Sequence, residues 1–146
     1  MRELPRKLTA DELAELFEGR TALVERLAEI EHPLERADEL IAELSEEEKL
    51  EALDAHPAIG QRVGLSVRSR AEQGDEEDAG VLEELAQLNH AYEQKFGFRF
   101  VVFVNRRPRS EIVPILRERL ERSREDELAT ALHELVAIAR DRWRRA

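Results

Sequence analysis

Phe98-Arg-Phe-Val-Val-Phe-Val104 is the only stretch of this 146-residue sequence that is dense in aromatic and β-branched residues. Taken alone, such a run predicts a β-strand. A strand needs a partner for its backbone hydrogen bonds, and no second run of this kind occurs elsewhere in the chain. We therefore expect residues 98–104 to form a buried extended connector, and the chain on both sides of it to be helical.

Helix-start signals occur on both sides of this connector. Thr9-Ala-Asp-Glu12 and Ser45-Glu-Glu-Glu48 have the capping-box spacing, in which a hydroxyl and a carboxylate bind free N–H groups of the first turn. Ser110 and Ser123 are expected to be the N-caps of two helices that follow the connector. The sequence predicts an all-α, single-domain bundle of about seven or eight helices with one extended connector, spanning residues 1–146.

The composition excludes several classes of protein. With 23 Lys and Arg against 33 Asp and Glu, the formal net charge is −10, which argues against a general nucleic-acid binder. The absence of Cys excludes disulfides, thiolate metal sites and cysteine nucleophiles. No apolar run approaches the ~20 residues of a membrane span, and the start of the chain has no signal-peptide core. We expect a cytoplasmic protein with no membrane partner.

The most informative histidine is His56, which is followed by Pro57. Proline disfavours helical geometry at the residue before it, so His56 is expected at a helix end. An imidazole titrates near pH ~6.5 and can move protons at physiological pH. The same dipeptide can also serve only as a helix stop, as His32-Pro33 is expected to do. No pair of histidines has the helical spacing of a metal site, so no metal is expected.

Two further segments offer polar groups to a ligand. Ser69-Arg-Ala-Glu72-Gln73 has capping-box spacing, and could also direct a hydroxyl, a carboxylate and an amide at a polar ligand. The extended segment 98–104 could present backbone N–H and C=O groups that suit a small, amide-rich ligand. A third segment, Arg106-Arg107-Pro108-Arg109, could form an anion-binding patch, although a solvated rim is the simpler interpretation.

Five motifs in order give the sequence a family resemblance. They are His56-Pro57, Ser69-x-x-Glu72-Gln73, Tyr92-Glu-x-Lys-Phe-Gly-Phe-x-Phe100, Glu127-Leu-Ala-x-Ala and Ile138-Ala-Arg-Asp-Arg142. This set resembles the 2-oxo-4-hydroxy-4-carboxy-5-ureidoimidazoline (OHCU) decarboxylases of urate degradation. The resemblance implies an all-α enzyme without metal or organic cofactor. It also implies a homodimer whose partner is a small-molecule substrate, OHCU, which loses its C4 carboxylate to leave (S)-allantoin.

The resemblance also implies residue roles. His56 and Glu72 would be catalytic, with His56 near the C4 substituents and Glu72 orienting the imidazole or the C4 hydroxyl. Ser69 and Gln73 would hold the ureido and ring amide groups, and Pro57 would line the pocket. The remaining expected substrate contacts are the backbone of Phe100, Val101, Val102, Phe103 and Val104, which would read the planar ring, and Arg142, which would face the departing carboxylate or a ring oxyanion.

Two other functions are compatible with the same residues. A protein of this fold could act on a different ureido or imidazolone acid, because the same polar groups would serve that chemistry. A non-enzymatic helical interaction module could instead use the arginines at 106, 107 and 109. In that case His56 would be dispensable. The choice of acid or base for His56 depends on burial and on Glu72, and both roles stay open.

Overall fold

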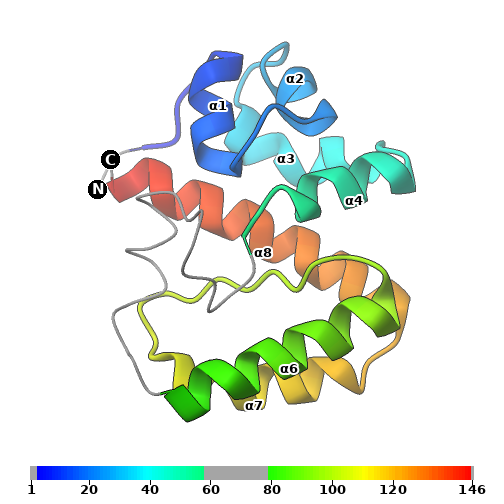
Figure 1. The fold of residues 1–146 in the computed structure, drawn as a ribbon. Coiled ribbons are helices and arrows are strands. Elements are labelled where there is room, and N and C mark those ends of the chain that lie inside the picture. Colours follow the sequence, from blue (N-terminus) through cyan, green and yellow to red (C-terminus); the bar gives the residue numbers. More distant parts are fainter. Residues whose placement is uncertain (1–2, 58–78, 146) are drawn as a thin grey trace. The chain divides into compact units, whose positions relative to one another are not determined.

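The computed structural model describes residues 3–57 and 79–145, and this part of the chain contains seven helices (Figure 1). No strand occurs within these ranges, and the predicted all-α fold class is confirmed. The chain forms two compact units, residues 1–56 with 132–146 and residues 57–131. A single domain over residues 1–146 stays a prediction. None of the helices in the described ranges is both long enough and apolar enough to span a membrane.

The first unit is organised around a short central helix. Its elements are α1 (Ala10–Phe17), α2 (Ala22–Leu27), α3 (Pro33–Ala42), α4 (Glu46–Asp54) and the C-terminal part of α8 (Arg124–Arg145). Helix α2 packs against α1, α3 and α4, and its Leu23, Val24 and Leu27 are fully buried. Helices this short are not stable in isolation, so α2 depends on this packing.

Side-chain caps fix where these helices begin. The Thr9 hydroxyl accepts from the Glu12 N–H at 3.1 Å, and the Glu12 carboxylate accepts from the Thr9 N–H at 2.9 Å. Ser45 and Glu48 form the same reciprocal pair at 3.1 and 3.0 Å, so both predicted capping boxes are confirmed. Helix α2 has a tertiary cap as well, because the Glu51 carboxylate of α4 accepts from the Ala22 N–H at 2.7 Å.

The second unit contains α6 (Ala79–Phe96), α7 (Arg109–Leu120) and the first part of α8. Helices α6 and α7 pack against each other and run side by side in Figure 1. Helix α6 ends at Phe96 and is followed by Gly97, whose φ of +81° lies in the left-handed region that glycine adopts readily. The chain then continues as residues 98–104 without regular secondary structure.

Most of segment 98–104 is buried as predicted, and only Arg99 and Phe103 are partly exposed. The Phe98 and Phe100 rings lie 5.9 and 5.2 Å from the Tyr92 ring of α6, both edge-on, which is a favoured arrangement for aromatic pairs. Val101, Val102 and Val104 are also buried, so side chains on both sides of the segment leave water. This two-sided burial, rather than pairing with another strand, accounts for its strand-like composition.

One of the two predicted caps after the connector is wrong. Ser123 does cap α8, since its hydroxyl accepts from the Asp126 N–H at 3.1 Å. Helix α7, however, begins at Arg109, one residue before Ser110, and its N-cap is Pro108. Asn105 and Arg106 both have positive φ, and this turn brings the chain into α7 earlier than the serine signal suggested. The Pro108 carbonyl then accepts from the Glu111 N–H at 2.9 Å.

Candidate active site

His56 lies where α4 ends. The helix stops at Asp54, and the His56 N–H donates to the Leu53 carbonyl at 3.2 Å in a last turn that Pro57 does not continue. The His56 side chain is buried, with the residue only 5% exposed. A buried imidazole just after a helix end has little freedom to move, which suits a proton-transfer group.

Arg142 of α8 belongs to the same unit and is 3% exposed. Its Nη1 donates to the Leu16 carbonyl at 3.2 Å and lies 3.0 Å from Glu18 Oε1. Both acceptors are at the C-terminal end of α1, where carbonyls lack helical partners and a cation is favoured. Arg142 therefore stabilises this end of α1 as well as being a candidate for substrate binding.

The turn after α1 also borders His56. A Cβ placed on Gly19 would lie 3.7 Å from the Ala55 Cβ, so the chain leaving α1 passes next to the residue before His56. Gly19 follows Glu18, the partner of Arg142. Two predicted site residues that are far apart in sequence, His56 and Arg142, are thus brought to one end of α1.

The other predicted contacts are distributed differently. Residues 100–104 belong to the second unit, as does Pro57, which is partly exposed. Ser69, Glu72 and Gln73 lie outside the described residues. The predicted roles of all these residues, and of His56 and Arg142, stay predictions.

The backbone of residues 100–104 has two different edges. The Val101 carbonyl accepts from Arg119 Nη1 at 2.8 Å, and the Phe103 carbonyl accepts from Arg107 Nη2 at 2.6 Å. Peptide units are planar and trans here, so the N–H groups of Val102 and Val104 point away from these arginines. In an extended chain the N–H and C=O of Val102 share that second edge.

This second edge is unoccupied by protein partners within the described residues. Phe100 and Val102 form no backbone hydrogen bond there, although they are only 2% and 7% exposed. Buried backbone groups are nearly always hydrogen-bonded, so donors and acceptors in this position are suited to a ligand. A neighbouring N–H and C=O match the alternating donors and acceptors of a cyclic amide.

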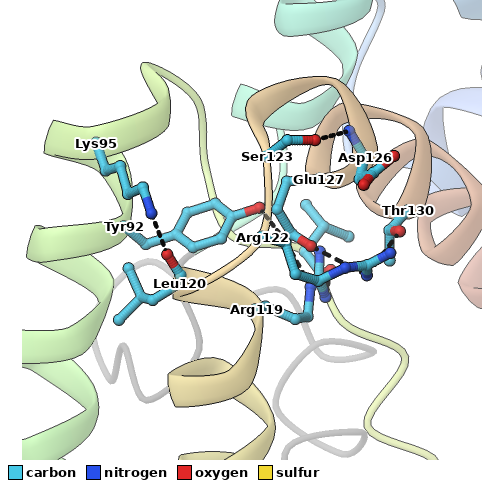
Figure 2. A network of polar contacts seen from close by, with 10 residues as sticks. Tyr92, Lys95, Arg119, Leu120, Arg122, Ser123, Asp126, Glu127 and Thr130 are labelled. Carbon is cyan, nitrogen blue, oxygen red and sulfur yellow. Dashed lines mark hydrogen bonds and ion pairs between the residues drawn. The ribbon is translucent and has the colours of Figure 1, made fainter.

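A buried polar network supports the other edge of residues 100–104, which carries the Val101 and Phe103 carbonyls (Figure 2). Glu127 of α8 is fully buried, and its Oε1 accepts from Tyr92 Oη and from Arg119 Nε, both at 2.7 Å. Its Oε2 accepts from Arg122 at 3.2 Å. Burial, and then the hydrogen bond to Glu127, raise the pKa of Tyr92 well above its ordinary value. The phenol therefore stays protonated and acts as a donor.

Sequence reasoning missed Arg119. The signal was its position, because Arg119 follows Ile112 and Leu116 at helical spacing and so lies on the apolar stripe of α7. A charged residue on such a stripe indicates a buried partner, which here is Glu127.

The arginine cluster after the connector is mostly turned inward. Arg109 is 5% exposed, and the Arg107 side chain donates to the Val104 carbonyl at 2.9 Å as well as to Phe103. Of the three arginines at 106, 107 and 109, Arg106 is the exposed one. A docking surface made from these three arginines therefore has little support in the structure.

Comparison with known proteins gives one consistent result. The OHCU decarboxylase family model matches residues 2–144. A 2-oxo-4-hydroxy-4-carboxy-5-ureidoimidazoline decarboxylase of Haloferax volcanii is 32% identical over 140 residues, covering 88% of this chain and 83% of its own. A uric acid degradation bifunctional protein of Bacillus sp. is 33% identical, covering 69% of this chain and 21% of its own.

A solved structure agrees with these sequence matches. The crystal structure of an OHCU decarboxylase in the presence of (S)-allantoin has a TM-score of 0.75 and 25% identity, covering 90% of this chain and 94% of that chain. The resemblance found in the sequence motifs is thereby confirmed. This chain belongs to the OHCU decarboxylase family.

Proposed function

We propose that this protein is a carboxy-lyase that converts OHCU to (S)-allantoin and CO2 during the degradation of urate. The observation that carries this proposal is the match of the family model to nearly the whole chain, residues 2–144. Two observations support it: His56 is buried, and the backbone edge at Val102 has no hydrogen-bond partner among residues 3–57 and 79–145. The reaction needs a held proton donor and a surface for a cyclic amide.

The chemistry of OHCU explains why few groups are needed. When the bond between C4 and its carboxylate breaks, CO2 leaves and the bonding electron pair enters the ring, where the adjacent C5=N imine accepts it. The imine nitrogen takes up a proton as it accepts the pair. A proton added at C5 and one lost from the C4 hydroxyl then give the amide carbonyl of allantoin, so one proton is consumed overall. No external electron sink is required, so we propose that the enzyme works without metal or organic cofactor. Protonation on one face gives a single enantiomer.

The proposed roles follow the predicted set. His56 delivers or removes the proton, and Glu72 orients the imidazole or the C4 hydroxyl. Ser69 and Gln73 bind the ureido and ring amides, Pro57 lines the pocket, and residues 100–104 bind the ring. Arg142 stabilises the departing carboxylate or a ring oxyanion. A hydrogen bond to a charged group of this kind is worth about 1.5–3 kcal/mol.

The test follows product formation from OHCU generated freshly from urate by the two preceding enzymes. Circular dichroism reports (S)-allantoin directly, because the product is chiral. The parent protein is expected to accelerate its appearance, and His56→Ala to reduce kcat by about 10²–10⁴-fold, as for loss of a positioned acid or base. His90→Ala is the matched control, since His90 is an exposed histidine on α6.

Either of two results would contradict the proposal. Product formation no faster than in the protein-free reaction would exclude OHCU as the substrate and favour another ureido or imidazolone acid. Full activity in His56→Ala would remove His56 from the mechanism, whatever the substrate.

We also propose a cytoplasmic homodimer with no nucleic-acid partner. Family resemblance supports the dimer, and the formal net charge of −10 disfavours binding to phosphate backbones. Sedimentation equilibrium should give a mass of twice 16.9 kDa. A monomer at the concentrations used for activity would contradict the dimer.

A further inference from the structure

We propose that Arg119 is a positioning residue for the substrate-binding edge of residues 100–104, and that Glu127 and Tyr92 hold Arg119 in place. This inference rests on the proposed function, because it assigns a cause to the orientation of the backbone that would bind the ring. It concerns three side chains from α6, α7 and α8, none of which is a predicted substrate contact.

The guanidinium of Arg119 is restrained from three directions. Nε donates to Glu127 Oε1 at 2.7 Å, Nη1 donates to the Val101 carbonyl at 2.8 Å, and the guanidinium carbon lies 4.5 Å from the centre of the Phe100 ring. Because guanidinium is a rigid planar fork, fixing Nε and the stacked face also fixes the direction of Nη1. Arg119 therefore determines where the Val101 carbonyl points.

The direction of the Val101 carbonyl determines the direction of the Val102 N–H on the opposite edge. The Val101 C=O and the Val102 N–H belong to one planar trans peptide and point in opposite directions. Rotation of this peptide away from Arg119 would turn the Val102 N–H away from a bound ring. In a β-sheet the neighbouring strand would prevent such rotation, but within the described residues no strand flanks this segment. Arg119 is the side chain that holds the Val101 carbonyl.

Tyr92 and Glu127 determine the position of Arg119 in turn. Glu127 is fully buried, and Tyr92 donates to the same oxygen that binds Arg119. A buried ion pair is weak evidence for stability, because desolvation offsets much of the attraction between its charges. What this arrangement supplies reliably is a fixed orientation, which matters where a backbone edge must match a ligand.

The kinetic test compares three variants of the full chain. Arg119→Lys keeps the positive charge beside Glu127 but loses the planar fork, and it should raise KM for OHCU about 5- to 10-fold with a much smaller change in kcat. Tyr92→Phe removes one donor to Glu127 with little change of volume, and should raise KM about 2- to 3-fold. Ser123→Ala is the control, because it removes the cap hydrogen bond from the Asp126 N–H and leaves the side-chain bonds of Arg119 to Glu127 and Val101 in place. It should lower Tm and leave KM unchanged.

A purely structural role would lower Tm in all three variants and leave KM of the folded enzyme unchanged. That result would overturn the inference. If Arg119→Lys does not fold, Tyr92→Phe decides the same question, since it leaves the Arg119–Glu127 pair intact.

An amide measurement without substrate separates this inference from the proposed function. In ¹⁵N-labelled protein, Arg119→Lys and Tyr92→Phe should shift or broaden the amide signals of Val101 and Val102, while Ser123→Ala should not. Unchanged signals in both variants would refute the positioning role even in an active enzyme. Inactivity of the parent toward OHCU would refute the proposed function, and the amide signals would still report on Arg119.

Discussion

At the residue scale, Tyr92 offers a direct measure of the buried network. It is the only tyrosine in the sequence, so phenolate absorbance reports on one group. Burial and the bond to Glu127 raise its pKa, and the folded protein should show no phenolate at about pH 11, where a free tyrosine is mostly ionised. In concentrated guanidinium chloride the same residue should titrate at about pH 10. Phenolate formation near pH 10 in the folded protein would show that the phenol is not held by Glu127.

The raised pKa also predicts how stability depends on pH. Because the folded state favours the protonated phenol, its contribution is fully present below the unfolded pKa of about 10. Above that pH only the unfolded state releases the proton, so the free energy of unfolding should fall as pH rises. Denaturation with urea at a series of pH values measures this slope. In Tyr92→Phe the free energy of unfolding should fall less steeply with pH, because the phenol is gone. If it falls as steeply as in the parent, other groups cause the pH dependence.

The site residues differ in how far sequence alone could predict them. His56-Pro57 is a local signal, since proline limits the backbone of the residue before it, and the structure does place His56 at a helix end. Arg119 acts through Glu127 and the Val101 carbonyl, eight and eighteen positions away. Such partners are set by how α7 and α8 pack, and a one-dimensional pattern shows only that a charge lies on an apolar stripe.

At the scale of elements, the tertiary cap on α2 can be tested. Glu51→Ala removes the carboxylate that accepts from the Ala22 N–H, and should lower the free energy of unfolding by about 1 kcal/mol. Glu51→Gln should cost less, because its amide oxygen can still accept the bond. Urea denaturation of both variants measures the difference. Equal losses in the two variants would show that the charge of Glu51, rather than its hydrogen bond, stabilises α2.

The helix starts show what local sequence determines. The predicted caps Thr9, Ser45 and Ser123 are confirmed. Each hydroxyl accepts from an N–H in the first turn of its own helix, so the interaction depends on neighbouring residues alone. Ser110 was predicted as a cap but is not one, because the positive-φ turn at Asn105 and Arg106 starts α7 before the serine is reached. Burial of residues 98–104 was predictable from their composition. The partners of the arginines that bind their carbonyls are set by helix packing and by a turn. Periodicity indicates only that Arg119 lies on the apolar stripe of α7.

At the scale of the whole molecule, net charge predicts the salt dependence of catalysis. The protein carries a formal net charge of −10, and the proposed substrate is a carboxylate anion. The charge of Arg142 is balanced locally by Glu18 at 3.0 Å, so the net charge should dominate the field that an approaching anion meets. Raising the salt concentration from about 10 to about 150 mM shortens the Debye length from about 30 to about 8 Å and screens this repulsion.

We therefore expect kcat/KM for OHCU to rise about twofold over that range of salt, measured by the initial rate of (S)-allantoin formation. The product is uncharged, so its inhibition constant should not change with salt, and it serves as the internal control for effects on the protein itself. A fall in kcat/KM with salt would show that positive groups at the site outweigh the net charge. Because Arg142 is already paired, such a field would have to arise from cations other than Arg142. A rise in kcat/KM with salt thus indicates that the net negative charge repels the substrate anion, and a fall indicates that positive groups near the site attract it.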